Sequence, residues 1–258
     1  MKLIQWCKYQ LYNLTINVFP KQKLLLFASS SKTKWIRDKF FRQQGLPEIY
    51  KKKIHYLQYN LYVSCPLQIL RKAETKGIEP SLSILILSQG DECIDIGANY
   101  GFITMIMAKK VGINGNVYSY ESDRYIFDIL VKNIQDNNFD NICSAENYFI
   151  SNNNIDNNQK IDDLLLEKSN KIKLIKIDTD ASDYNCLLGA EELIKKHRPV
   201  IIIEMTENRG KIYQKLIDLG YEYFCDNHYN TVQPNNLPHD LTASHNPLQY
   251  FSSDLYKE

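Results

Sequence analysis

From about residue 78 onward, the sequence alternates short apolar strands with helical stretches, and this alternation constrains the fold more than any other feature. Strands are predicted at 93–96, 117–120, 142–149, 172–177, 199–203 and 221–225. Helices are predicted at 101–110, 123–136, 182–196 and 208–219. Strands separated by helices of this length pair in parallel and carry helices on both faces. The expected fold class is therefore α/β with a mostly parallel, Rossmann-like sheet.

The charge distribution divides the chain into two regions. Residues 1–76 carry a net charge of +12, and residues 77–258 carry −11, within an overall charge of +1. We therefore predict a basic, aromatic-rich N-terminal extension over 1–76 and the α/β domain over 77–258. The extension is expected to be helical over 1–45, with a strand or hairpin at 54–63. Residues 226–258 are expected to be mostly loop, with a last strand at 248–251.

Several classes of protein are disfavoured by the composition. Uninterrupted apolar runs such as 24–28 are far shorter than the roughly 20 residues that a membrane-spanning helix needs. Lys8 interrupts any signal-type apolar core near the start of the chain. The 6 cysteines are spread singly, which fits neither a zinc site nor a disulfide scaffold. We therefore expect a cytoplasmic protein without a transmembrane segment, with reduced thiols.

The segment with the clearest chemical meaning follows the first strand of the α/β domain. It reads Asp-Ile-Gly-Ala-Asn-Tyr-Gly over residues 95–101 and leads directly into a helix. Ligands of open parallel sheets bind outside the carboxyl ends of the strands, where two glycines let the backbone approach a ligand closely. The helix start adds backbone amides and a positive dipole end.

An acidic residue on the next strand narrows the ligand to a nucleoside. Glu121 ends that strand, 24 residues after Gly97, where a carboxylate can accept hydrogen bonds from both ribose hydroxyls. The glycine spacing is G-x-x-x-G and not the G-x-G-x-x-G of pyrophosphate-binding turns. S-adenosylmethionine contains a ribose and an amino-acid end but no phosphate, so it is the expected cofactor.

Three segments together resemble the FkbM family of S-adenosylmethionine-dependent methyltransferases. They read ECIDIGANYGFITMIMAKK, VYSYESD, and IDDLLLEK through IIIEM, within about residues 78–225. The resemblance implies a class I methyltransferase fold, whose seven-stranded sheet has one antiparallel strand, and O-methylation of sugar or natural-product hydroxyls. It also implies a set of cofactor-binding residues, which is Glu79, Asp95, Gly97, Ala98, Asn99, Gly101 and Glu121. In this set Glu121 holds the ribose, and the others lie near the methionine end.

The chain departs from the family pattern after its fourth strand. The family motif there is Lys-Ile-Asp-x-Glu-Gly-x-Glu, and this chain has Lys-Ile-Asp-Thr-Asp-Ala-Ser-Asp over 176–183. Asp180 and Asp183 keep the charge but are one methylene shorter, and Ala181 replaces a glycine. A Cβ at that position costs strain if the backbone needs a positive φ, and it narrows the space beside the substrate. The substrate therefore does not follow from the resemblance.

Two aspartates are the candidate catalytic residues. Methyl transfer to a hydroxyl is aided by a base that takes the proton, and Asp178, at the end of the fourth strand, is the first candidate base or hydrogen-bond acceptor. Asp180 is the second, although Asp180 and Asp183 also fit a structural role at a helix start. Asp178 with Glu204 offers hard oxygen ligands for a divalent ion, but no third ligand is evident, so no metal site is predicted.

The predicted function is S-adenosylmethionine-dependent O-methylation of a hydroxyl on a sugar, glycan or other small molecule. A nucleic-acid methyltransferase is the alternative, because residues 1–76 interleave basic charge with aromatic rings that can stack on RNA bases. A non-catalytic adaptor on the same fold is a third hypothesis, based on a basic amphipathic stretch near 33–43. The sequence does not indicate an oligomeric state.

Overall fold

The computed structural model describes residues 49–56, 59–74, 86–180, 182–228 and 230–248. The chain divides into two compact units. One comprises residues 1–52 and 65–77, and the other comprises 53–64 and 78–258. The predicted helix over 1–45, the stretch near 33–43, and residues 249–251 of the predicted last strand lie outside the described residues.

A hairpin and a short helix precede the α/β domain. Strands β1 (Ile49–Tyr56) and β2 (Tyr59–Pro66) form a two-stranded sheet, and helix α4 (Leu67–Glu74) follows. The hairpin confirms the prediction made from the aromatic and β-branched residues at 54–63. Its two strands alternate unevenly between buried and exposed residues, and the first carries consecutive exposed lysines at 51–53.

The α/β domain is built on a seven-stranded sheet with the order β10-β11-β9-β8-β3-β4-β5. Its strands are β3 (Glu92–Ile96), β4 (Asn116–Tyr120), β5 (Cys143–Glu146), β8 (Ile172–Ile177), β9 (Val200–Glu204), β10 (Tyr223–Cys225) and β11 (Asp240–Ser244). Strand β11 is antiparallel to both of its neighbours, whereas the pairs from β9 to β5 are parallel. The predicted sheet with one antiparallel strand is therefore confirmed.

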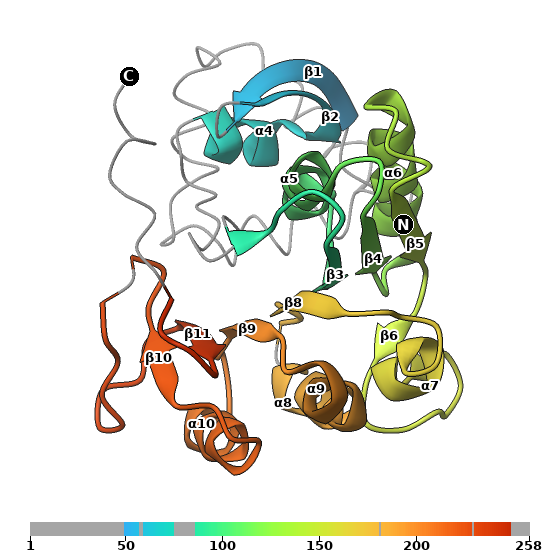
Figure 1. The fold of residues 1–258 in the computed structure, drawn as a ribbon. Helices are drawn as coiled ribbons and strands as arrows, with labels where there is room; N and C mark the ends of the chain where they lie inside the picture. Colours follow the sequence, from blue (N-terminus) through green and yellow to red (C-terminus); the bar gives the residue numbers. More distant parts are fainter. Residues whose placement is uncertain (1–48, 57–58, 75–85, 181, 229, 249–258) are drawn as a thin grey trace, which may run out of the picture. The chain divides into compact units, whose positions relative to one another are not determined.

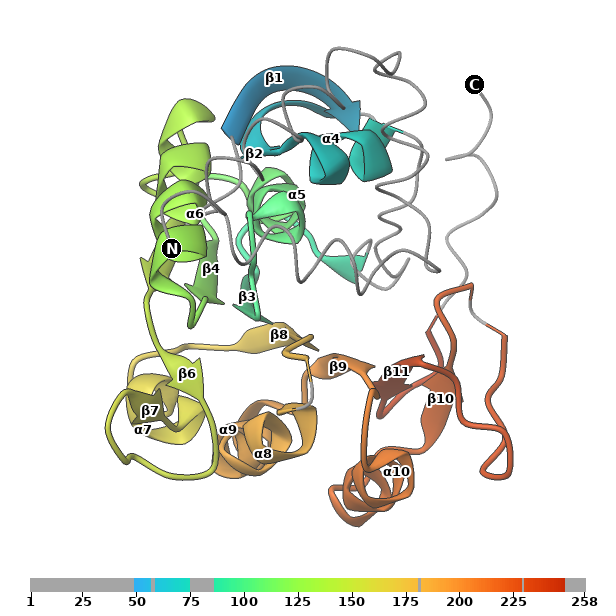
Figure 2. The same ribbon diagram turned by 180° about the vertical axis from the view of Figure 1, so that it is seen from behind.

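Helices cover both faces of this sheet (Figures 1 and 2). On one face lie α5 (Phe102–Val111) and α6 (Arg124–Asp136), and on the other lie α7 (Ile161–Leu165), α8 (Asp183–Leu188), α9 (Glu191–His197) and α10 (Arg209–Asp218). Helix α6 begins as predicted, because the Asp123 carboxylate accepts a hydrogen bond from Ile126 N at 3.0 Å. The central strands β3 and β8 are buried between the two helical layers, as their apolar runs predict.

Two predicted elements are cut short or divided in the structure by contacts with segments distant in the sequence. The strand predicted over 142–149 ends at Glu146, because its neighbour β4 ends at the paired Tyr120. Phe149–Ile150 instead forms β6, which pairs with β7 (Asn158–Gln159) in a separate small sheet. The helix predicted over 182–196 is divided at Gly189, whose carbonyl accepts a hydrogen bond from Asp162 N at 3.0 Å.

None of the helices in the described ranges is long and apolar enough to cross a membrane.

Candidate active site at the carboxyl ends of the strands

The carboxyl ends of four neighbouring parallel strands meet at one edge of the sheet. The glycine turn follows β3, Glu121 follows β4, Asp178 follows β8, and Glu204 is the last residue of β9. Parallel pairing places Ile96 beside Tyr120 on one side and beside Ile177 on the other, so the residues that follow these strands come together. The sheet register thus assembles the residues that the sequence indicated separately.

The turn after β3 is closed too tightly for side chains at its glycines. Gly97 has a φ of 77°, and a Cβ added there would lie 1.8 Å from the backbone oxygen of Asp178. Gly101 has a φ of 85°, and its added Cβ would lie 2.5 Å from Leu130 Cδ1. Between them, Asn99 adopts a φ of 52°. The two glycines are needed both for the left-handed backbone and for the close approach of β8 and α6.

The amides of this turn are already bonded within the protein. Gly97 N and Ala98 N both donate to Tyr120 O, and Gly101 N donates to Ala98 O. Asn99 N donates to Glu121 Oε2 at 2.9 Å, and Tyr100 N donates to Asn99 Oδ1 at 2.8 Å. A pyrophosphate needs such amides to be available. The turn therefore does not form a phosphate cradle, which agrees with the sequence prediction of a cofactor without phosphate.

Glu121 is held against the turn by two backbone amides. Its Oε2 accepts from Asn99 N at 2.9 Å, and its Oε1 accepts from Asp123 N at 2.8 Å. The residue is 8% exposed, and burial raises the pKa of its carboxyl, while the amide hydrogen bonds oppose that rise. Each carboxylate oxygen keeps a second lone pair. Both are thus able to accept one hydroxyl of a ribose, so the residue fits its predicted role.

The start of α5 offers backbone donors beyond the turn. The first intrahelical bond runs from Met105 N to Gly101 O, so the amides of Phe102, Ile103 and Thr104 precede the intrahelical ladder. These donors and the positive end of the helix dipole suit a carboxylate, such as the amino-acid end of the expected cofactor. Glu79, which the family resemblance also places there, lies outside the described residues.

Asp95 is located inside the fold. It is fully buried, and its Oδ2 accepts a hydrogen bond from the Thr104 hydroxyl at 2.6 Å. Its Oδ1 lies 3.4 Å from Lys176 Nζ. These contacts tie β3 to α5 and β8, and the predicted role of Asp95 in cofactor binding stays a prediction. Ala98 is also buried, and its amide is bonded to β4.

Lys176 joins Asp95 to the candidate base Asp178. Its ammonium lies 3.4 Å from Asp95 Oδ1 and 3.1 Å from Asp178 Oδ2. Burial disfavours the charged ammonium, but the two carboxylates outweigh this and raise the pKa of Lys176. Burial likewise disfavours ionised Asp178, but Lys176 outweighs it and lowers the pKa of this carboxyl. Asp178 is therefore an ionised carboxylate, and its side chain remains 46% exposed.

The two shortened acids of the following loop differ in their surroundings. Asp183 is buried, and its Oδ1 accepts from Thr179 N at 2.9 Å and Thr179 Oγ1 at 2.8 Å. Its Oδ2 accepts from Thr206 Oγ1 at 3.1 Å, so Asp183 ties the loops after β8 and β9 together. Asp180 is exposed, with a φ of 50°. Asp183 thus has a structural role, whereas Asp180 forms no hydrogen bond or ion pair within the described part of the chain. Ala181 lies outside them.

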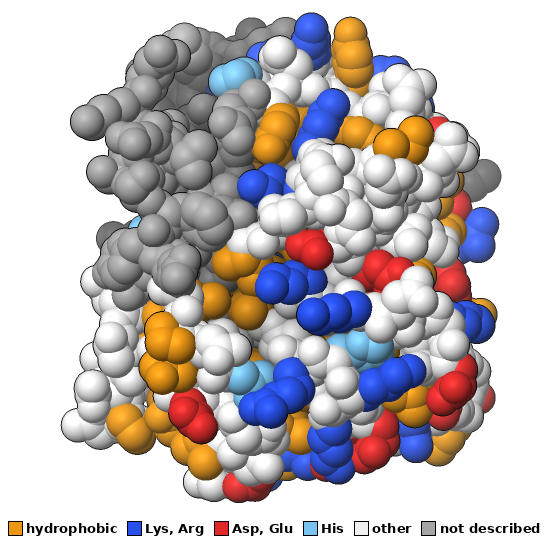
Figure 3. All heavy atoms as spheres, in the orientation of Figure 1, with side chains coloured by type: hydrophobic (Ala, Val, Ile, Leu, Met, Phe, Trp, Pro, Cys, Tyr) orange, Lys and Arg blue, Asp and Glu red, His pale blue; other side chains and the backbone are white. Residues whose placement is uncertain are grey.

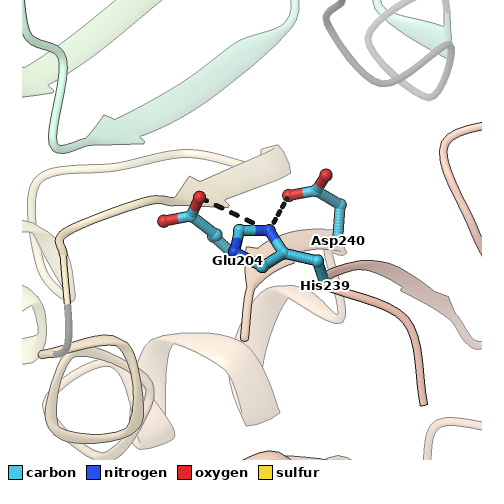
Figure 4. A group of neighbouring side chains, drawn as sticks. All are labelled: Glu204, His239 and Asp240. Atoms are coloured by element: carbon cyan, nitrogen blue, oxygen red, sulfur yellow. Dashed lines mark hydrogen bonds and ion pairs between the residues drawn. The ribbon is translucent and has the colours of Figure 1, made fainter. Parts of the chain in front are cut away.

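A further cluster joins the site from a region that the sequence analysis treated as loop. His239 Nδ1 lies 3.5 Å from Glu204 Oε1 and 3.4 Å from Asp240 Oδ1, so the ring stands between two carboxylates (Figure 4). Glu204 also lies close enough to Asp178 for the two carboxyls to share a hydrogen bond. Burial and the negative charge of Asp178 raise the pKa of Glu204 to about 8.

Comparisons with known proteins agree with the predicted resemblance. The model of the methyltransferase FkbM domain matches residues 144–223, which confirms it, and the model of protein-L-isoaspartate(D-aspartate) O-methyltransferase matches residues 32–147. No curated protein sequence matches this chain.

Solved structures with a similar fold include three methyltransferases. The FkbM methyltransferase of Methylobacillus flagellatus is 18% identical, with a TM-score of 0.49, and the alignment covers 61% of this chain and 44% of that one. This chain thus spans less than half of that protein's length. The O-methyltransferase of Bacillus cereus, solved with SAH, is 20% identical over 66% and 80% of the chains, with a TM-score of 0.46. Fibrillarin of Aeropyrum pernix, with bound S-adenosylmethionine, is 12% identical over 77% and 100%, with a TM-score of 0.42.

Proposed function

We propose that this chain is an S-adenosylmethionine-dependent methyltransferase of class I that methylates a hydroxyl group of a sugar, glycan or other small molecule, and the FkbM match over 144–223 supports the proposal. The observation that carries the proposal is the placement of Asp178. Its backbone oxygen lies against Gly97 of the cofactor turn, and its carboxylate is half-exposed and kept ionised by Lys176. A carboxylate in this state is suited to accept a hydrogen bond from a neutral hydroxyl.

In this proposal, Glu121 and the start of α5 bind the cofactor, and Asp178 contacts the acceptor. Glu121 accepts hydrogen bonds from the ribose hydroxyls, and the amides that begin α5 bind the carboxylate of the methionine end. When bound, S-adenosylmethionine would supply the methyl group, which would move from its sulfur to the acceptor oxygen. The Asp178 carboxylate orients the acceptor hydroxyl and takes its proton, which then passes to solvent. Alignment of this kind contributes several kcal/mol, roughly 7–11 at its upper limit.

The cofactor pocket is tested by measuring binding of S-adenosylmethionine calorimetrically to the full chain and to two variants. Glu121→Gln is expected to weaken binding about 10-fold or more, because an amide replaces the ionised acceptor of two hydroxyl hydrogen bonds. Glu167→Gln removes an equal charge from an exposed position after α7 and is the matched control. Equal affinities in the two variants would show that the cofactor does not use this pocket.

The acceptor is tested with methyl-labelled S-adenosylmethionine and fractionated small-molecule, glycan and RNA pools. Label is expected in a hydroxyl-bearing small molecule or glycan and is expected to be stable to mild base, as an ether is and an ester is not. Asp178→Asn should reduce the labelling rate roughly 100-fold, within the usual range for a general base, while cofactor affinity stays within about 3-fold. Label confined to RNA, or unchanged labelling by the variant, would overturn the proposal.

A nucleic-acid acceptor is the second candidate, because β1 presents three consecutive exposed lysines, Lys51, Lys52 and Lys53. Lys53 Nζ lies 5.8 Å from the ring centre of Tyr62, which is itself exposed. Figure 3 shows basic side chains beside apolar ones at the top of the view, where Figure 1 draws β1. RNA binding that weakens steeply with salt, and that is lost when the three lysines become glutamines, would favour this candidate.

A further inference from the structure

Glu204 lies close to two residues that are distant from it in the sequence, His239 and Asp240. This cluster combines one imidazole nitrogen with two carboxylates. Their ligand atoms all lie within 4.8 Å of one another. The distances from His239 Nδ1 to the two carboxylates, 3.5 and 3.4 Å, are those of neighbouring ligands around one ion. With metal–ligand bonds of about 2.0–2.2 Å, tetrahedral or octahedral angles separate neighbouring ligands by roughly 3.0–3.5 Å.

The sheet itself forces the two carboxylates together. Asp240 is directly opposite Glu204 in the antiparallel pairing of β11 with β9, so the two side chains are on the same face. Two carboxyls in directly opposed positions repel each other when both are ionised. Asp178 adds a third carboxyl beside Glu204. Among the described residues, no lysine or arginine forms an ion pair with Glu204, and its buried Oε2 has no hydrogen-bond partner.

The surroundings hold the cluster in position. Met205 N donates to the backbone oxygen of His239 at 2.6 Å, which fixes the histidine beside the end of β9. Asn227 Nδ2 donates to Asp240 Oδ2 at 2.9 Å, which leaves Asp240 Oδ1 directed toward the imidazole. Such supporting hydrogen bonds orient the ligands of metal sites. The cluster is therefore a preformed arrangement of three ligands, each held by backbone pairing or a neighbouring side chain.

We propose that Glu204, His239 and Asp240 bind one divalent transition-metal ion, with positions left open on its solvent side. A site of one imidazole and two carboxylates suits Mn²⁺ or Zn²⁺ better than Ca²⁺, which prefers oxygen ligands alone. The side chains of His239 and Asp240 are 50% and 40% exposed, so solvent or a ligand can reach the ion. Binding of the ion requires neither the cofactor nor an acceptor, so the proposal stands apart from the proposed reaction.

The site is tested by titrating the chelator-treated full chain with Mn²⁺ and following the loss of the free-ion EPR signal. We expect one ion per chain, and a 10-fold or larger loss of affinity in Asp240→Asn and in Glu204→Gln. The isosteric asparagine still accepts the hydrogen bond from Asn227. The matched control is Glu207→Gln, which removes the same charge from an exposed residue just beyond β9. Circular dichroism and thermal melting establish that each variant is folded.

The outcomes separate a metal site from a protonated histidine held by two carboxylates. Stoichiometric Mn²⁺ or Zn²⁺ binding that is lost in both cluster variants, and kept in Glu207→Gln, supports the proposal. Absence of binding by either ion at millimolar concentration overturns it, and so does an equal loss in all three variants. S-adenosylmethionine affinity, measured on the same samples, shows separately whether the cofactor pocket is intact. The metal-binding result can therefore be interpreted even if the proposed methyl transfer is not observed.

Discussion

Replacement of Gly97 by alanine should destabilise the protein more than any other single glycine-to-alanine change at this edge of the sheet. A φ of 77° costs an L-residue about 1–2 kcal/mol. The new Cβ would also lie 1.8 Å from Asp178 O, a backbone atom that moves only if the end of β8 moves. Overpacking of this kind costs about 1–3 kcal/mol. The two effects together predict a loss of about 2–5 kcal/mol in the free energy of unfolding.

Two other glycines separate the backbone effect from the clash. Gly90 has a φ of 88°, but its added Cβ would meet nothing closer than Asn114 O at 4.0 Å, so Gly90→Ala should lose only the conformational part, about 1–2 kcal/mol. Gly210 lies in α10 with no atom within 4 Å of an added Cβ, so Gly210→Ala should be neutral or stabilise by up to about 1 kcal/mol.

The assay for all three variants is urea unfolding followed by circular dichroism, with S-adenosylmethionine affinity measured in parallel. The expected order of stability loss is Gly97→Ala, then Gly90→Ala, then Gly210→Ala. Cofactor affinity should fall only for Gly97→Ala, because the cofactor-binding turn must open to make room for the alanine Cβ. A Gly97→Ala variant that is no less stable than Gly90→Ala would refute the close approach of β8 to the turn.

Two further predictions concern the buried ion pair of Lys176 and a partly buried histidine. Lys176→Met should cost about 3–5 kcal/mol in urea unfolding, because it leaves Asp95 buried without its cation, and the double variant with Asp95→Asn should recover much of that loss. His197 Nδ1 accepts a hydrogen bond from Ile172 N, and burial lowers the pKa of this ring below its ordinary 6.5, so folding favours the neutral form. The free energy of unfolding that neutral His197 contributes is therefore fully present above the unfolded-state pKa of the ring. It is lost as the pH falls through the lower folded-state pKa. The wild type should lose more stability than His197→Gln between about pH 7.5 and pH 5.5, and a parallel loss in both would contradict this assignment.

The sequence predicted those parts of the fold that depend on local pattern. Apolar runs and helical periodicity located β3, β4, β8 and β9 to within a residue or two, and Asp123 marked the start of α6. The helix break at Gly189 and the early end of β5 depend on contacts with distant segments, and no local pattern encodes them.

The candidate site could likewise be predicted only where it depends on local sequence patterns. Gly97, Glu121 and Asp178 follow apolar strands whose parallel pairing brings their ends together, so their proximity follows from the pattern. The third ligand beside Glu204 did not follow, because His239 and Asp240 are in a polar, proline-containing region that reads as loop. Strand β11 forms there because β9 and β10 offer it antiparallel partners on both sides. Its register, which no local signal specifies, then places Asp240 opposite Glu204.

The ends of β8 and β9 illustrate how neighbouring strands give two carboxyls different roles. Lys176 lies two residues before Asp178, so the two side chains are on the same face of the extended chain. Among the described residues, the Lys176 ammonium forms ion pairs only with Asp178 and Asp95. Asp178 is thereby kept ionised, while Glu204 faces Asp178 and Asp240 without a lysine or arginine partner in the described chain. Glu204 lies beside the ionised Asp178, so a negative charge on Glu204 is disfavoured, and the pKa of its carboxyl is raised to about 8. A cation bound by Glu204, His239 and Asp240 would favour the ionised form of Glu204 without disturbing the ion pair between Lys176 and Asp178.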